Sequence, residues 1–385
     1  METVSKLQTI AAHMNLEPAE ETTITAPCGV RVSNKRQAEL GVFRAALPGG
    51  RTVPLLKTML TTACERNCTY CPFRAGRNYR RTTVKPEELA QTFMQMNRAG
   101  LVEGLFLSSG IIKGGVATQD KLLDTVDILR RRHHFRGYVH LKIMPGAEKA
   151  QVERAMQLAD RLSVNLEAPT SQRLAVLAPQ KQFLAELLQP LQWVEEIRQT
   201  QPARLGWNGR WPSTVTQFVV GAVGDSDVEL LSATEYLYQR LRLSRAYFSA
   251  FHPIVDTPLE NLPATPQERQ NRLYQASFLL RDYGFDLETL PFDQEGNLPL
   301  DRDPKRAWAE TALADKPVEL NRASREELLQ VPGIGPQSAA AIIAARRRAT
   351  LRELSELQAI GLRTRPLEPF VLLDGQRPTY QLRLF

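Results

Sequence analysis

Residues 60–73 have the sequence Leu60-Thr-Thr-Ala-Cys64-Glu-Arg-Asn-Cys68-Thr-Tyr70-Cys71-Pro-Phe73, in which the cysteines are spaced as C-x3-C-x2-C. The chain of 385 residues has four cysteines, and three of them lie in this segment. Such clustering argues against a disulfide framework and indicates a metal or cluster site in a reducing compartment. The apolar run 55–60 just upstream is typical of a buried strand, so the cysteines begin where a strand ends.

Three thiolates on one loop can bind three irons of a cubane 4Fe–4S cluster, and the fourth iron then stays open for a ligand that is not protein. The alternatives are a zinc site or unrelated thiols. Structural zinc favours C-x2-C pairs and four protein ligands. This loop holds no histidine, and Cys28 is distant in sequence. We therefore favour the cluster.

Downstream of a polar lead-in, residues 1–53, short apolar runs alternate with amphipathic helix patterns. The expected strands are 55–60, 104–108, 138–144, 162–166, 215–220 and 246–251. The expected helices are 86–98, 120–132, 147–160, 183–199, 227–241 and 266–283. This alternation predicts an α/β fold whose parallel sheet, with right-handed crossovers, curves into a full or partial barrel. The cysteine loop would lie at the carboxyl end of the first strand, where such barrels place their chemistry.

Cys64, Cys68, Tyr70 and Cys71 resemble the signature of the radical S-adenosylmethionine (radical SAM) superfamily, over roughly residues 54–285. The resemblance implies a partial (β/α)6 TIM-like barrel. It also implies that the three cysteines hold a 4Fe–4S cluster whose open iron is chelated by S-adenosylmethionine. One electron, from a donor such as flavodoxin or ferredoxin, would release a 5′-deoxyadenosyl radical that takes a hydrogen atom from the substrate. Tyr70 would pack beside the adenine, or alternatively serve as an aromatic core residue.

The second expected strand ends in Ser108-Ser109-Gly110, where superfamily members carry a glycine-bearing motif, more often Gly-Gly-Glu. The resemblance implies that these residues meet the methionine amino group. The alternative is an ordinary strand-to-loop turn, where serine and glycine are common.

Polar residues alternate with apolar ones along residues 138–143 and 162–167, so each polar set lies on one face of its strand. If that face points into the barrel, the interior is a polar cavity. Asn165 and Glu167 would then stand where superfamily members contact the ribose or the methionyl part. Gly221, after the fifth strand, resembles a glycine that lines the adenine. The alternative for Asn165 and Glu167 is that they are solvated, or that their hydrogen bonds are made within the protein and serve its structure alone.

Arg74, Arg77, Arg80 and Arg81 follow the cysteine loop within eight residues. As a group they favour an anionic substrate, and Tyr79 among them could stack on a base. A solvated face is the alternative for any single arginine.

Residues 318–375 form a further expected domain, which is helical and rich in alanine and arginine. Ser324 is expected to cap a short helix, with Glu327 completing a capping box. Gly333 and Gly335 permit a tight hairpin, and Pro336 suits the start of the next helix. Amides at such a hairpin, leading into a helix N-terminus, can bind a phosphate.

The pattern V-P-G-I-G-x-x-x-A-x-x-I over residues 331–342 resembles a helix-hairpin-helix motif, whose family binds DNA backbones with little sequence preference. The resemblance implies nucleic-acid contacts by Gly333, Ile334, Gly335, Gln337, Ser338, Arg346 and Arg347. A protein-docking or purely structural hairpin is the alternative. Residues 354–369 look like a decayed second copy, in which Ala359 replaces the first glycine.

Composition sets the remaining limits. Hydrophobic residues make up 43% and charged residues 24% of the chain, which excludes global disorder. No apolar run is long enough to span a bilayer, and the start does not resemble a secretory signal, so we expect a cytoplasmic protein. The net charge of +7 permits nucleic-acid contact. We place a connector at 286–317 and a tail at 376–385.

Together, the barrel and the helical tail resemble a family of radical SAM proteins assigned to DNA modification or repair. The leading hypothesis is an enzyme that modifies or repairs a nucleotide in DNA, presented as an extruded base or in a single strand. One alternative is an enzyme that modifies RNA, including transfer RNA. Another is a non-catalytic iron–sulfur protein that binds nucleic acid. Cys28 is either a core thiol or a hydrogen donor to a substrate radical.

Overall fold

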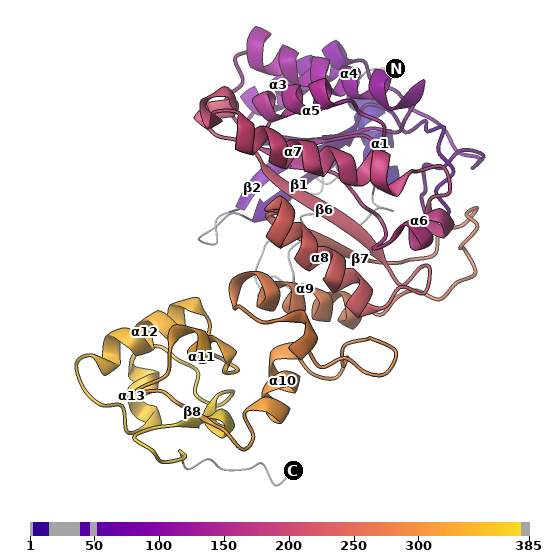
Figure 1. Cartoon of the computed structure of the whole chain (residues 1–385). Helices are drawn as coiled ribbons and strands as arrows, with labels where there is room; N and C mark the ends of the chain where they lie inside the picture. The colour runs from indigo at the N-terminus through magenta and orange to yellow at the C-terminus, as the bar shows by residue number, and fades with distance from the viewer. Residues whose placement is uncertain (1–2, 15–38, 47–51, 379–385) are drawn as a thin grey trace. The chain divides into compact units, whose positions relative to one another are not determined.

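The computed structural model of the chain describes residues 3–14, 39–46 and 52–378 (Figure 1). Cys28 lies outside these residues, so its predicted role stays a prediction. The chain divides into two compact units. The first comprises Met1–Asp225 and Tyr236–Pro266, and the second comprises Ser226–Glu235 and Gln267–Phe385.

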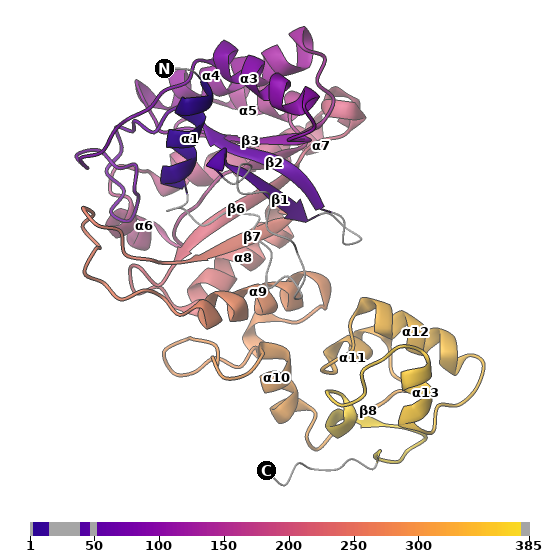
Figure 2. The ribbon, with the colours of Figure 1, turned by 180° about the vertical axis from the view of Figure 1, so that it is seen from behind.

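A seven-stranded sheet, whose strands follow one another in chain order, forms the centre of the first unit. Its parallel strands are β2 (Thr52–Met59), β3 (Gly104–Ser108), β4 (Tyr138–Lys142), β5 (Arg161–Ser163), β6 (Ser213–Val220) and β7 (Arg245–Ala250). At one edge, β1 (Val42–Ala46) pairs antiparallel with β2. The sheet curls into a half-barrel, as Figure 2 shows from behind, which confirms the expected partial barrel.

Helices join successive parallel strands, because parallel neighbours need a crossover connection. They are α3 (Pro86–Arg98), α4 (Gly114–Asp127), α5 (Lys149–Leu158), α6 (Ser171–Leu177), α7 (Gln189–Thr200) and α8 (Asp227–Leu241). The ranges of α3 and α8 agree with the prediction. Each starts with acidic residues beside the positive end of the helix, Glu87 and Glu88 in α3. The predicted helix 183–199 is instead a π-helical segment, Phe183–Leu188, followed by α7.

Two segments of the predicted polar lead-in, residues 1–53, form a helix and a strand that the sequence did not lead us to expect. Helix α1 (Thr3–Met14) buries Leu7, Ile10, Ala11 and Met14, whose spacing is that of one helical face. The β1 strand then adds an antiparallel edge to a sheet that was expected to be wholly parallel.

The second unit consists mainly of helices: α9 (Gln267–Asp282), α10 (Pro304–Ala312), α11 (Arg325–Gln330), α12 (Pro336–Arg346) and α13 (Leu354–Ala359). Two short parallel strands, β8 (Val318–Glu319) and β9 (Val371–Leu372), add a small sheet to the domain that was expected to be all helical. The α10 helix lies in the segment predicted to be a connector. The hydrophobic core of the second unit contains Leu320, Leu328, Ile342 and Phe370.

None of the described helices combines the length and the apolar character that a membrane crossing requires.

Candidate functional site

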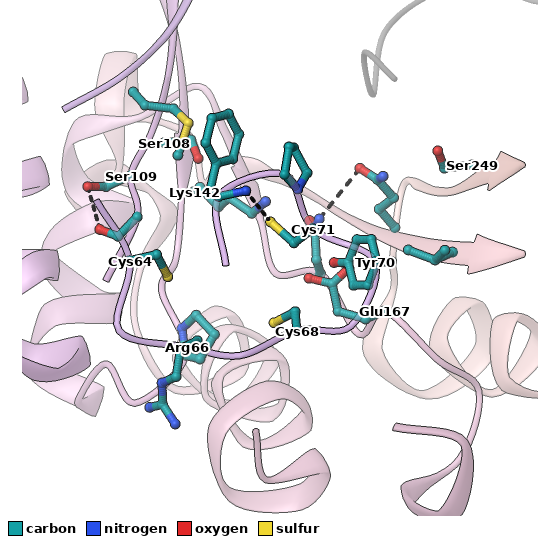
Figure 3. A pocket seen from close by; sticks show the side chains of 18 of the residues that line it. Cys64, Arg66, Cys68, Tyr70, Cys71, Ser108, Ser109, Lys142, Glu167 and Ser249 are labelled. Carbon is teal, nitrogen blue, oxygen red and sulfur yellow. Dashed lines mark hydrogen bonds between the residues drawn. The ribbon is translucent and has the colours of Figure 1, made fainter. Parts of the chain in front are cut away.

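A pocket opens at the carboxyl ends of the parallel strands in the first unit (Figure 3). It encloses about 1200 Å³ of space without protein atoms, its mouth included. The predicted site residues that line it are Cys64, Cys68, Tyr70, Cys71, Ser108, Ser109, Gly110, Asn165 and Glu167. The fold therefore gathers into one cavity side chains that lie about a hundred positions apart in the sequence.

Gly221 is not among the residues that line this pocket. Its amide donates to both carboxylate oxygens of Asp225, at 3.1 and 3.0 Å, and its φ of 84° lies in the left-handed region. Gly221 therefore shapes the turn after β6 in this structure.

The cysteine loop presents its three sulfurs to the pocket from separate positions (Figure 3). Cys68 is buried, and Cys64 and Cys71 are half-buried. Backbone amides approach two of the sulfurs: that of Ile111 lies 3.4 Å from Cys64 Sγ, and that of Phe73 lies 3.4 Å from Cys71 Sγ. Burial raises the pKa of the Cys68 thiol, and the attraction of Lys181 opposes that rise.

No three Cys, His, Asp or Glu side chains of the described residues gather around one point as ligands of a single metal ion. A cubane cluster instead takes each thiolate at a different iron. The donor set of this loop fits that requirement: three sulfurs at the wall of one pocket, two of them near backbone amides.

Arg81 holds the cysteine loop in shape through its guanidinium group. One nitrogen donates to the carbonyls of Thr62 at 2.9 Å and Phe73 at 2.7 Å, and the other to those of Arg74 at 2.7 Å and Arg77 at 3.1 Å. The planar fork of arginine can serve four carbonyls at once, whereas a lysine ammonium cannot.

Arg74 and Arg77 of this segment have similar structural roles. The Arg74 side chain donates to the carbonyl of Cys68 at 3.2 Å, and that of Arg77 to those of Pro72 and Val255. The Tyr79 ring lies against the Arg81 guanidinium, 3.8 Å from ring centroid to guanidinium carbon. Arg74, Arg77, Tyr79 and Arg81 thus have contacts within the protein, whereas Arg80 is exposed, and an anionic substrate at this segment stays a prediction.

We expect Arg81→Lys to lower the free energy of unfolding by about 2–4 kcal/mol, because several carbonyls lose a charged donor. Arg81→Lys should also take up less iron during anaerobic reconstitution, because the cysteine loop is held less firmly. The neighbouring Arg80 is exposed, so Arg80→Lys is the matched control. Urea unfolding and iron analysis of both variants check this; equal behaviour of the two would contradict the bracing role of Arg81.

Gly110 lies where the segment after β3 meets the cysteine loop. Its amide donates to the carbonyl of Thr61 at 2.8 Å. A Cβ atom added to Gly110 would stand 2.1 Å from the carbonyl oxygen of Ala63, so only glycine permits this approach. The adjacent Ser108 and Ser109 are buried and complete this part of the wall.

Glu167 forms a buried polar network on the opposite wall. Its carboxylate accepts from the Tyr70 hydroxyl at 2.7 Å and from the Lys181 ammonium at 2.8 Å. Burial alone would raise the pKa of Glu167, but the attraction of Lys181 and Lys142, with the two hydrogen bonds, lowers it. The residue has a φ of 66°, which is uncommon for a non-glycine residue and is a strain often found at functional sites.

The polar faces predicted for residues 138–143 and 162–167 line the cavity only at their carboxyl ends. Lys142, Asn165 and Glu167 all contribute to its wall, and the Asn165 amide lies 3.5 Å from Gln217 Oε1. Figure 3 shows the Lys142 side chain pointing toward Cys71. His140 lies deeper, fully buried, with its ring centroid 4.4 Å from that of Phe106.

Sequence reasoning missed Lys57, Lys181 and Gln217 as lining residues. Lys57 and Gln217 interrupt apolar runs, and that interruption was an available signal. Lys181 lies in a loop after α6, so only the fold brings it to Glu167.

In the second unit, the predicted hairpin joins α11 and α12. The capping box is present: the Glu327 amide donates to Ser324 Oγ at 3.1 Å, and the Ser324 amide to Glu327 Oε2 at 2.6 Å. Gly333 has a φ of 84°, and a Cβ there would lie 3.1 Å from Pro366 Cβ. Thus residues 354–369 pack against the hairpin, as expected of a decayed copy.

The predicted nucleic-acid contacts differ in their accessibility. Gln337 and Arg347 are exposed, and Ser338 and Gly335 are half-buried. The Ile334 side chain is buried and its amide donates to the Val331 carbonyl, so Ile334 serves the core. Arg346 donates from one nitrogen to the carbonyls of Leu320 at 2.9 Å and Ala323 at 2.7 Å, which gives it a structural role here.

Comparisons with known proteins agree with this geometry. The family model described as the radical SAM superfamily matches residues 58–199, and that of the helix-hairpin-helix motif matches residues 316–345. Proteins of the radical SAM superfamily use a 4Fe–4S cluster and S-adenosylmethionine. No curated protein matches the sequence.

Several solved structures resemble the chain at low identity. The FeFe-hydrogenase maturase HydG from Carboxydothermus hydrogenoformans is 15% identical, with a TM-score of 0.46 over 59% of this chain and 51% of that chain. Methylornithine synthase (PylB) is 14% identical, with a TM-score of 0.46 over 60% of this chain and 62% of that chain. The radical S-adenosylmethionine methyltransferase TsrM from Kitasatospora setae, with cobalamin and a 4Fe–4S cluster bound, is 12% identical, with a TM-score of 0.41 over 54% and 39%. The chain thus spans less than two thirds of each of them.

The two family matches lead to one conclusion. The chain contains a radical SAM domain in its first unit and a helix-hairpin-helix motif in its second.

Proposed function

We propose that this protein is a radical SAM enzyme that modifies or repairs a nucleotide in DNA. The observation that carries the proposal is the presence, on one chain, of a radical SAM domain and a helix-hairpin-helix motif. The first supplies radical chemistry and the second a way to bind a nucleic-acid backbone. We take the radical SAM core to span residues 54–285 and the helix-hairpin-helix domain to span 318–375.

We assign three irons of the cluster to Cys64, Cys68 and Cys71. When bound, the cluster and S-adenosylmethionine supply the 5′-deoxyadenosyl radical that takes a hydrogen atom from the substrate. The electron comes from a small donor such as flavodoxin or ferredoxin. The chain's own task is to bind, to orient and to exclude water.

Ser108, Ser109 and Gly110 stand beside the cysteine loop, where they would meet the methionine amino group. Asn165 and Glu167 would face the ribose or the methionyl part, and the Tyr70 ring the adenine. The lowered pKa of Glu167 keeps it a carboxylate at neutral pH. Because a carboxylate has about four lone-pair sites, Glu167 can accept from a ribose hydroxyl while it also accepts from Tyr70 and Lys181.

The hairpin would bind a phosphate through its amides, and the exposed Gln337 and Arg347, with the half-buried Ser338, would contact the backbone nearby. Backbone contacts position a duplex without reading its sequence. The target nucleotide must leave the stack to reach a cavity inside a half-barrel, so an extruded base or a single strand is the expected substrate.

The test is anaerobic incubation of reconstituted protein with dithionite and S-adenosylmethionine. Separate reactions receive single-stranded DNA, duplex DNA, RNA or no nucleic acid, and 5′-deoxyadenosine is quantified. We expect DNA to raise its formation above the reaction without nucleic acid, together with a mass change in one DNA nucleoside.

Stimulation by RNA alone would move the substrate to RNA. Formation of no 5′-deoxyadenosine under any condition would contradict the enzymatic proposal and favour an iron–sulfur protein that only binds nucleic acid.

A further inference from the structure

The glycine hairpin between α11 and α12 rests on a buried lysine of α10. Lys305 Nζ donates to the carbonyl oxygen of Ile334 at 2.6 Å, and the residue is only 9% exposed. The ammonium also lies 4.7 Å from the ring centroid of Tyr283. Lys305 lies outside the segment matched to the helix-hairpin-helix motif, residues 316–345.

The Ile334 carbonyl and the Gly335 amide belong to one peptide unit. In a planar trans peptide the C=O and the N–H point in opposite directions, and no described peptide bond is cis. With Lys305 at the oxygen, the N–H points away from Lys305. It does so at the N-cap position of α12, where the helix dipole already favours an anion.

An ammonium at the carbonyl end polarises this peptide and makes its N–H a stronger donor, because hydrogen bonds in a chain reinforce one another. The charge also adds positive potential behind the hairpin. A buried ammonium is costly for a fold, so stability alone gives no reason to place one here. Burial lowers the pKa of Lys305 to about 7, against the opposing attraction of Asp303.

We propose that Lys305 is a positioning residue of the phosphate site, and that its ammonium strengthens the Gly335 amide as a donor to a nucleic-acid phosphate. This inference rests on the proposed function, in which the hairpin binds a DNA backbone. Lys305 itself touches no phosphate.

The test measures binding of full-length protein to a fluorescein-labelled DNA duplex by anisotropy. Lys305→Met removes the charge, and Lys305→Gln removes the charge while it keeps a donor for the Ile334 carbonyl. Lys121→Met, an exposed lysine of α4, is the control for net charge. We expect both Lys305 variants to bind roughly 3–10-fold more weakly, as befits loss of a partly buried dipole–charge interaction.

Two readouts separate this role from direct contact and from simple misfolding. Since Lys305 releases no counterion, the slope of log K against log [salt] for the Lys305 variants should match that of wild type, whereas Arg347→Met should reduce the slope by about 1.

The second readout is the pH dependence of binding. Residues 267–385 contain no histidine and no cysteine. The groups that face the ammonium are Tyr283, whose pKa is raised, and Asp303. Because the pKa of Lys305 is about 7, its ammonium loses its proton as the pH rises from 6 to 8. The affinity of wild type for DNA should therefore fall more steeply over this rise than that of Lys305→Met.

The outcomes are distinct. If wild-type protein does not bind DNA or RNA, the proposed function fails. If wild type binds and both Lys305 variants bind equally well with the same pH profile, the inference about Lys305 fails. Thermal unfolding accompanies each measurement. If Lys305→Met unfolds at a lower temperature than wild type, the comparison rests on Lys305→Gln. Weaker DNA binding by a variant that is as stable as wild type supports the inference.

Discussion

Cys68→Ala protein is expected to fold but to lose its iron. Cys68 lies between the other two cysteines in the loop, and its sulfur lines the pocket. Loss of a residue that merely supports a metal ligand costs about 10–100-fold in metal affinity, so loss of a ligand should cost more. We expect reconstituted Cys68→Ala to lack the brown colour of the cluster and to form no detectable 5′-deoxyadenosine.

Cys28→Ala is the matched control, because it removes the one cysteine that lies outside the loop. It should keep its iron. If it also forms product normally, Cys28 is not the hydrogen donor. Iron retained at the wild-type level by Cys68→Ala would contradict the assignment of the cluster to this loop.

Lys181→Met should destabilise the first unit strongly. Lys181 and Glu167 form a buried ion pair, with side chains 9% and 5% exposed. Removing one partner leaves a buried charge without compensation, which costs about 3–5 kcal/mol. The double variant Lys181→Met with Glu167→Gln should recover part of the loss, because it buries no lone charge.

Lys149→Met is the control for this variant. Lys149 pairs with Glu196 at 2.6 Å, but both side chains are about half exposed, and such surface pairs contribute about 0–1 kcal/mol. Urea unfolding of the cluster-free proteins compares the two. Equal effects of Lys181→Met and Lys149→Met would contradict the importance of the buried pair.

The pH dependence of the pair follows from the directions of the two pKa shifts. The pKa of Glu167 is lowered, so the pair contributes fully at pH 7, and its contribution declines as the pH falls below about 4.3, the ordinary value for glutamate. The pKa of Lys181 is raised, so no loss is expected between neutral pH and pH 10. In Lys181→Met, Lys181 no longer opposes the effect of burial, so the pKa of Glu167 rises and the variant is relieved as that carboxylate takes up a proton. The difference in unfolding free energy between wild type and Lys181→Met should therefore shrink as the pH falls from 7 into acid.

The parallel part of the sheet could be predicted from the sequence because its signals are local. The strand Gly104–Ser108 and the helix Pro86–Arg98 have the predicted ranges, since apolar periodicity and Pro86 mark them. Helix α1 has an equally clear apolar face, but it precedes the residues that the resemblance covers and stands in a segment whose composition is mainly polar.

The candidate site was predictable where residues adjoin a motif or, as with Asn165 and Glu167, follow the polar face of a strand. The three cysteines and Ser108–Gly110 follow strands directly, so their convergence follows from the parallel order of the sheet. Lys181 could not be found in this way, because its partner Glu167 is 14 positions away across a helix. The roles of Arg81 and Arg346 were also missed, because a sequence does not say which carbonyls a guanidinium will meet.

The most direct test of the central claim is electron paramagnetic resonance of the anaerobically reconstituted, dithionite-reduced protein, with and without S-adenosylmethionine. We predict the signal of a reduced 4Fe–4S cluster that changes when S-adenosylmethionine is added, because the iron without a cysteine ligand binds it. A colourless protein that holds zinc, or a cluster signal that S-adenosylmethionine leaves unchanged, would contradict the account.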